Sequence, residues 1–260
     1  MNFKDYLDFV CQYYHKIEYI QTDPLRYVYW FKTPKEKEFI GLLVALFSYG
    51  NRKAIFQFLD RLILNLYPNP LEKIQEINLN SLDLYYRFQS KKDIQLILEI
   101  FKEILMENSK NPYIFFNEFG FTKNKTDIFK SIDNFQNRME QRIPKKFNTF
   151  GIKHYFTFSD QSLAKRYCLF FRWMVRDAFP DLRIYSFLDK KDLMYPVDVH
   201  ILNFAYQFKI IQKKYSKRET AIKITNFFKN LNPSDPLYYD FYLTRDLMLN
   251  SKFKEHNVLF

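Results

Sequence analysis

Apolar residues recur at helical spacing along almost the whole chain, and this pattern is the strongest constraint on its fold. In residues 2–19 the apolar side of the expected helix carries Phe3, Tyr6, Leu7, Val10, Tyr13 and Tyr14. The alternating pattern of β-strands is scarce. We therefore predict an all-α protein of about ten helices joined by short loops.

Proline, serine and glycine mark where several of these helices begin and end. Ser162 is suited to cap a helix, Pro196 to open one in its first turn, and Asp235 with Pro236 to start another. The polar stretch 121–130 is expected to connect two lobes. The pattern predicts helices over 34–50, 51–70, 92–107, 126–142, 162–178, 197–211, 216–230 and 235–249, and an extended piece over 23–31.

The composition excludes some classes of protein and favours others. Only four glycines occur in 260 residues, so neither a dinucleotide-binding loop nor a Walker A loop can be formed. The net charge of +11 suits a nucleic-acid partner, whose phosphates dominate binding. An AT-rich genome, which enriches Lys, Asn, Ile, Phe and Tyr, is the alternative explanation of the same charge.

The two cysteines, Cys11 and Cys168, lie far apart in the sequence. A disulfide framework or a zinc site is therefore not expected, and a cluster held by four cysteines is impossible within this chain. We expect no cofactor and no metal. The acidic residues in the N-terminal stretch argue against a signal peptide, and no apolar run is long enough to span a membrane. We therefore expect a cytoplasmic protein with no membrane partner.

Two stretches carry candidate catalytic residues. Lys165 falls in the first turn of the helix expected in "SLAKRYCLFFRWMVRDAF", where a cation opposes the helix dipole. A lysine in a partly buried, electropositive place loses its proton more easily and then attacks carbon. A solvated lysine or a phosphate contact is the alternative. Asp198 in "YPVDVHILNF" lies at a helix start, where it caps the helix, performs chemistry, or does both. His200 is the histidine nearest to it, with a core histidine as the alternative reading.

Two further stretches combine rings with polar groups. The loop in "LFSYGNRKAIF" presents Tyr49, Asn51 and Arg52, which suit a DNA groove, although a plain turn between helices explains them too. The stretch "NPSDPLYYDFYLTRDL" places Tyr239, Asp240 and Phe241 together. Rings stack on bases and a carboxylate accepts hydrogen bonds from base N–H groups, whereas ordinary packing is the alternative.

Together these motifs resemble a known family. The segments "DPL", "FIGLLVALFSYGNRKAI", "AKRYCLFFRWMVR", "PVDVHILNFA" and "DPLYYDF" are similar to a bacterial family labelled as a domain of unknown function, over residues 23–248. That family in turn resembles the helix-hairpin-helix DNA glycosylases, and most of all the archaeal 8-oxoguanine glycosylases. The resemblance implies one two-lobed helical domain over residues 1–260, with a cleft between the lobes. The hairpin would be atypical, because residues 155–170 contain no glycine.

The resemblance also implies an activity. It assigns Lys165 as the nucleophile that attacks C1′ of the sugar and forms a Schiff base, and Asp198 as the carboxylate that stabilises positive charge on the sugar. Tyr49 or Asn51 would fill the gap left by the extruded base, and Tyr239, Asp240 and Phe241 would recognise that base. Further DNA-binding candidates are Arg52, Arg166, Arg172 and His200. The expected partner is double-stranded DNA with an oxidised base, bound by a monomer associated with the nucleoid.

Two other functions stay open at this point. A non-catalytic module that binds DNA or RNA through its basic face needs no convergence of Lys165 with Asp198. A glycosylase for alkylated bases without lyase action would use Asp198 but not Lys165.

Overall fold

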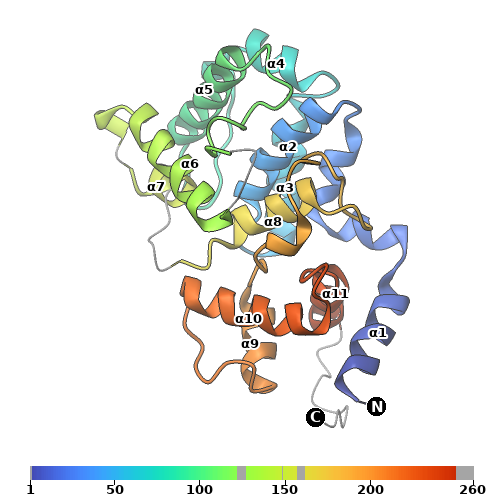
Figure 1. The fold of residues 1–260 in the computed structure, drawn as a ribbon. Helices are drawn as coiled ribbons and strands as arrows, with labels where there is room; N and C mark the ends of the chain where they lie inside the picture. Colours follow the sequence, from blue (N-terminus) through green and yellow to red (C-terminus); the bar gives the residue numbers. More distant parts are fainter. Residues whose placement is uncertain (1, 122–126, 148, 157–161, 250–260) are drawn as a thin grey trace. The chain divides into compact units, whose positions relative to one another are not determined.

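The structure is a computed structural model that describes residues 2–121, 127–147, 149–156 and 162–249. These residues form helices and no β-strand, with one isolated bridge between Tyr86 and Gln89 (Figure 1). The all-α prediction is therefore confirmed. Within the same ranges, no helix combines the length and the apolar character needed to cross a membrane.

The chain divides into two compact units. Unit 1 comprises Met1–Asp23 and Asp160–Phe260, and unit 2 comprises Pro24–Ser159. The helices of unit 1 are α1 (Phe3–Tyr14), the 3-10 helix η1 (Ile17–Thr22), α8 (Lys165–Val175), the 3-10 helix η5 (Lys190–Asp192), α9 (Val199–Gln207), α10 (Arg218–Leu231) and α11 (Asp240–Leu249). The helices of unit 2 are η2 (Pro24–Trp30), α2 (Pro34–Phe47), α3 (Arg52–Leu64), α4 (Pro70–Glu76), η3 (Leu79–Ser81), α5 (Lys91–Glu107), α6 (Ile128–Arg142), η4 (Lys145–Phe147) and α7 (Phe150–Phe156).

Helix α2 is the centre of unit 2. It begins at a capping box, in which the Thr33 hydroxyl accepts from the Glu36 backbone N–H and the Glu36 carboxylate accepts from the Thr33 backbone N–H. Every residue from 38 to 47 is buried, and α2 packs against η2, α3, α4 and α7. Even Glu38 is fully buried, because its carboxylate accepts hydrogen bonds from the backbone N–H groups of Ile114 and Phe115 at 2.7 and 2.9 Å. An apolar helix on all sides fits a core position.

In unit 1 the N-terminal helix packs on the C-terminal one. Helix α1 contacts α11, and α11 contacts α9. The Asp246 carboxylate in α11 accepts hydrogen bonds from the hydroxyls of Tyr6 and Tyr14 at 2.5 and 3.2 Å. Arg245 forms an ion pair with Asp23, also buried. These buried polar contacts join residues more than 200 positions apart in the sequence.

Several predicted helix boundaries need correction. Helix α8 begins at Lys165 and not at Ser162, whose hydroxyl accepts from the Ala164 backbone N–H at 3.1 Å. Helix α9 begins at Val199, so Pro196 precedes the helix and does not lie in its first turn. Asp235 starts no helix either, because α11 begins at Asp240. Buried Asp235 instead binds the Arg176 guanidinium at 2.8 Å.

Two larger expectations also differ from the structure. Residues 24–30 form the 3-10 helix η2 rather than an extended piece. The stretch 121–130 does not connect the two units, because it lies within unit 2, and its residues 122–126 fall outside the described ranges. Most of the expected hairpin loop, residues 157–161 between α7 and α8, also lies outside them.

Candidate functional site

Lys165 lies in the first turn of α8, as the sequence predicts, and is the first residue of this helix. The preceding Ala164 is fully buried and has a left-handed backbone with φ of 48°, a conformation that costs a non-glycine residue about 1–2 kcal/mol. No side chain caps this helix start. The Lys165 side chain is half-buried, and its amine makes no hydrogen bond or ion pair with any described residue. A strained, uncapped helix start thus carries a lysine whose amine has no polar partner among the described residues.

Asp198 is the N-cap of α9, so the predicted cap is confirmed. Its Oδ1 accepts a hydrogen bond from the Ile201 backbone N–H at 2.9 Å, which satisfies one of the free donors of the helix end. Asp198 is half-buried, and its second oxygen has no hydrogen-bond partner among the described residues. One carboxylate oxygen therefore serves the helix, and the other is available to a ligand.

Lys165 and Asp198 belong to the same unit but form no ion pair. Burial raises the pKa of Asp240, Arg172 opposes this, and the negative charge of Asp198 raises it further. Burial also raises the pKa of Cys168, one turn beyond Lys165, to about 12; Arg218 opposes this and Asp240 adds to it. Asp240 thus interacts electrostatically with Asp198 and with the first turns of α8.

His200 and Arg166 lie next to these two residues in the sequence. His200 is half-buried in the first turn of α9 and makes no hydrogen bond or ion pair with any described residue. Arg166 is buried, with 4% of its surface exposed. The proposed contact of Arg166 with DNA stays a prediction, although little of this side chain is accessible.

Arg172 and Asp240 form a buried ion pair. Arg172 Nη1 donates to Asp240 Oδ2 at 2.5 Å, and Arg172 Nε donates to Asp181 Oδ1 at 3.2 Å. Both residues of the first pair are at most 2% exposed. Burial alone would lower the pKa of Arg172, but the two aspartates outweigh it and keep the guanidinium charged. The pair is buried and ion-paired in unit 1, and a role of either residue in binding DNA stays a prediction.

The two rings beside Asp240 are buried as well. Tyr239 donates to Asp8 Oδ1 at 3.1 Å. Phe241 packs edge-on against Phe179, with ring centroids 5.7 Å apart. These contacts agree with packing, the alternative to base recognition, and the expectation that the two rings stack on a base stays a prediction. Within this stretch the more exposed ring is Tyr238, at 37%.

The loop between α2 and α3 places Tyr49, Asn51 and Arg52 on unit 2. Asn51 is exposed and caps α3, accepting from the Ala54 backbone N–H at 2.8 Å. Arg52 is exposed and makes no hydrogen bond or ion pair with any described residue. Tyr49 is half-buried and donates to the side-chain oxygen of Gln89. The turn between helices that sequence reasoning offers as the alternative is present, and it carries an accessible cation.

Residues that sequence reasoning does not single out surround Tyr49. The Arg87 guanidinium lies 5.6 Å from the Tyr49 ring centroid and 5.3 Å from that of Phe88. The Phe88 ring is nearly parallel to Tyr49, with centroids 6.2 Å apart, and His154 lies 4.5 Å from Tyr49. Phe88 is 44% exposed. We call Tyr49, Arg87, Phe88 and His154 the aromatic cluster. Its signal in the sequence is the ring-rich stretch "YYRF" at 85–88.

Gly50 allows this cluster to form. Its backbone is left-handed, with φ of 99°, and a Cβ at this position would collide with Arg87 Nη1. A side chain at residue 50 would therefore push the guanidinium away from the two rings. The left-handed backbone favours glycine at this position, and the absence of a side chain leaves room for the Arg87 guanidinium.

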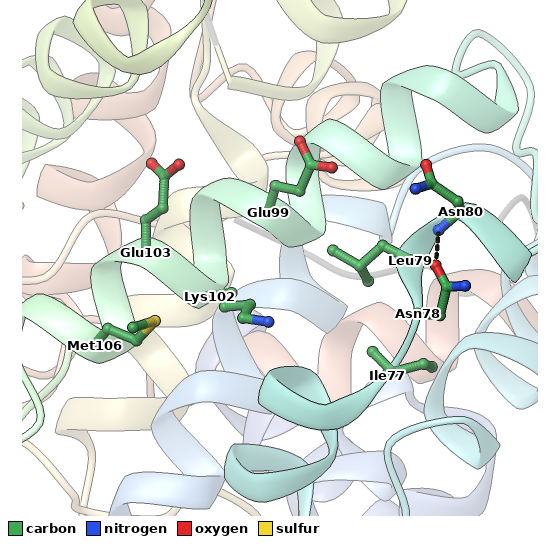
Figure 2. Close-up of a pocket in the computed structure, with 8 residues that line it drawn as sticks. All are labelled: Ile77, Asn78, Leu79, Asn80, Glu99, Lys102, Glu103 and Met106. Carbon is green, nitrogen blue, oxygen red and sulfur yellow. Dashed lines mark hydrogen bonds between the residues drawn. The ribbon is translucent and has the colours of Figure 1, made fainter.

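A hollow of about 360 Å³ lies elsewhere on unit 2, between α5 and the segment 77–80 (Figure 2). Figure 2 shows four α5 side chains along it, Glu99, Lys102, Glu103 and Met106. Lys102 Nζ donates to the Gln75 backbone oxygen at 2.7 Å, so this cation already has a partner within the fold. None of the predicted site residues lines the hollow.

The comparisons with known proteins place the chain in a family. Residues 23–248 match the family described as protein of unknown function (DUF2400), and the chain therefore belongs to it. The predicted membership of a family labelled as a domain of unknown function is confirmed over the predicted residues. Searches for similar curated proteins and for similar solved structures find no significant match. The likeness to DNA glycosylases stays a prediction.

Proposed function

We propose that this protein is a base-excision repair DNA glycosylase with an associated β-lyase activity, acting on 8-oxoguanine in double-stranded DNA. One observation carries the proposal. Lys165 stands at a strained, uncapped helix start without a polar partner among the described residues, in the unit where Asp198 keeps one carboxylate oxygen available. Schiff-base excision needs an amine and a carboxylate, and Lys165 and the second oxygen of Asp198 have no hydrogen-bond partner among the described residues.

The reaction follows from these two groups. In its neutral form, the Lys165 amine attacks C1′ of the deoxyribose, a C–N bond forms to the enzyme, and the N-glycosidic bond breaks. The bonding electrons leave with the base, which takes up a proton. Positive charge develops on the sugar at this stage, and the Asp198 carboxylate stabilises it. The sugar ring then opens to a Schiff base, and loss of the C2′ proton eliminates the 3′ phosphate.

The α2–α3 loop supports a contact with DNA. The target base has to leave the helical stack before C1′ can be reached, which costs a few kcal/mol. In this proposal Tyr49 or Asn51 would fill the gap, and Arg52 and Arg87 would add positive charge for the phosphates. The rings of the aromatic cluster stack on bases, which contributes about 1–3 kcal/mol per base.

Borohydride trapping tests this proposal. The wild-type protein, Lys165→Gln and the control Lys4→Gln are incubated with duplexes that contain 8-oxoguanine opposite each normal base. Lys4 is an exposed lysine of unit 1 without a partner among the described residues, so its substitution removes the same charge. We expect a covalent protein–DNA band in the wild type and in Lys4→Gln, and none in Lys165→Gln.

Each other result has a definite meaning. A band that persists in Lys165→Gln removes Lys165 as the nucleophile. Base release without any trapped band points to a glycosylase without lyase action. Tight DNA binding with neither base release nor trapping on 8-oxoguanine or on alkylated bases would leave a non-catalytic binding module.

A further inference from the structure

We propose that the connection between α9 and α10 holds a binding site for backbone phosphates of a nucleic acid. The site is a cavity of about 390 Å³ in unit 1, lined among others by Lys209, Lys213, Lys217 and Lys223 with Tyr215. We call it the lysine pocket; the loop that lines it connects α9 and α10 in Figure 1. The inference rests on the proposed function for the identity of the polyanion, but it assigns residues outside the catalytic pair.

The charges of the lysine pocket are unbalanced. Its only carboxylate, Glu219, binds Lys223 Nζ at 2.6 Å, and that lysine lowers the pKa of Glu219. Lys209, Lys213 and Lys217 make no hydrogen bond or ion pair with any described residue. Three ammonium groups that line one cavity repel each other, and an anion among them removes this repulsion. The pocket is therefore suited to a group that carries several negatively charged oxygens.

Tyr215 supports two of these lysines. Lys213 Nζ and Lys217 Nζ lie 6.0 and 5.8 Å from the centroid of its ring. Tyr215 is 52% exposed, and Lys213 and Lys217 are exposed as well. A phosphate that accepts hydrogen bonds from two lysines and a tyrosine hydroxyl would be held by three donors.

The backbone at the start of α10 adds to the positive potential. Lys217 is the N-cap of this 14-residue helix, and no side chain accepts a hydrogen bond from its first N–H groups. Those donors and the positive end of the helix dipole favour an anion. Together with the lysines they form a surface that attracts phosphate from several directions.

The basic surface continues beyond the pocket, which favours a polymer over a single nucleotide. Lys214 Nζ lies 4.8 Å from the ring centroid of Tyr206, which is 47% exposed. A chain of phosphates can contact the pocket and this neighbouring cation together, whereas a free nucleotide fills one of them. The chain's net charge of +11 agrees with a polyanionic partner.

The test is the salt dependence of DNA binding by the full chain. Affinity for a short undamaged duplex is measured by fluorescence anisotropy over a series of salt concentrations. The variants are Lys213→Gln with Lys217→Gln, and a control pair, Lys4→Gln with Lys110→Gln. Both control lysines are exposed and make no hydrogen bond or ion pair with described residues. The melting temperature of each variant checks that it is folded.

We expect the pocket pair to lower affinity about tenfold or more at low salt. Its slope of log affinity against log salt should become shallower by about 2, since each lost phosphate contact removes about 0.9. The control pair should keep the wild-type slope. If the pocket pair and the control pair lose the same amount of affinity for DNA, the proposal is overturned, because the affinity would then depend on net charge alone. Tripolyphosphate is titrated as a second probe. Suppose that the pocket pair loses tripolyphosphate binding but keeps the wild-type salt slope for DNA. This result would overturn the nucleic-acid assignment in favour of a free polyphosphate.

The same variants separate this proposal from the proposed function. A shallower slope in the pocket pair, with no trapped band in the wild type, leaves the phosphate site standing and removes the glycosylase. A trapped band in the wild type, with a wild-type salt slope in the pocket pair, supports the glycosylase and removes the phosphate site. If both proposals hold, the pocket pair should give less trapped complex than the wild type at low protein concentration and the same yield at saturating protein.

Discussion

Arg172 and Asp240 form a buried ion pair between the C-terminal part of α8 and the first residue of α11, with 2.5 Å between Nη1 and Oδ2. Asp181 contacts both Arg172 and Arg176, and Asp235 completes the set at Arg176. Two cations and three carboxylates thus lie in the core of unit 1. Their mutual positions hold the helix that begins at Lys165 against the helix that ends the described chain.

Removing one partner of this pair should destabilise the protein strongly. Arg172→Met leaves the Asp240 carboxylate buried without its cation, and we expect a loss of about 3–5 kcal/mol in the free energy of unfolding. The double variant Arg172→Met with Asp240→Leu removes both charges and should recover part of this loss. Urea denaturation of the three proteins measures both effects. A loss below about 1 kcal/mol in the single variant would contradict a structural role for the pair.

Local patterns in the sequence are sufficient to predict the long helices. Helix α5 carries a long apolar stripe after the Ser90 capping box, and the predicted range 92–107 differs from Lys91–Glu107 by one residue. The seven-residue helices α4 and α7 are too short for a helical period to stand out. The 3-10 helix η2 follows neither the helical nor the strand period, which explains why it is predicted as extended.

Both cysteines should be protected by burial, and this has a consequence for stability. Burial raises the pKa of Cys11 and of Cys168 to about 12 in the folded protein. In the unfolded chain the pKa of a cysteine thiol is about 8.5. The stabilising contribution of each protonated thiol is therefore full below that pH and decreases as the pH rises toward 12. The slope is at most about 1.4 kcal/mol per pH unit and thiol.

Urea denaturation between pH 8 and pH 10 measures this slope, at about half-unit intervals. The double variant Cys11→Ala with Cys168→Ala is the control, and it should lose the dependence in this interval. Above pH 10 both proteins should lose stability, because burial and Asp246 raise the pKa of Tyr6 above that of an exposed tyrosine. A wild-type stability that stays constant from pH 8 to pH 10 would show that the folded thiols ionise normally.

Substituting Gly50 should disturb the aromatic cluster. Gly50→Ala introduces a Cβ in a left-handed conformation and against Arg87 Nη1, so we expect a loss of about 1–3 kcal/mol in stability. Adding Arg87→Ala removes the collision but not the backbone strain, and should recover part of the loss. Thermal unfolding of both variants checks this. Additive effects of the two substitutions would mean that the guanidinium moves aside at no cost.

The candidate site is only partly predictable from sequence. The capping role of Asp198 is visible because a cap is a local feature, set by the residues that follow it. The burial of Arg172 is not visible, because its partner Asp240 lies 68 residues away along the chain. The same holds for Arg87, whose approach to Tyr49 depends on Gly50 and on the turn at 86–89. Whether a charged side chain is buried or exposed depends on contacts between residues far apart in the sequence, which local patterns do not reveal.

Two substitutions at Asp198 should separate its cap from its chemistry. Asparagine is as good an N-cap as aspartate, so Asp198→Asn should keep the stability within about 0.5 kcal/mol. It removes the charge that stabilises the sugar, and the single-turnover rate of 8-oxoguanine release should fall by roughly a hundredfold or more. Asp198→Ala should show the same fall in rate and lose about 1 kcal/mol in addition. Rate measurements and urea denaturation are made on both variants. If Asp198→Asn releases the base at the wild-type rate, Asp198 is a helix cap alone.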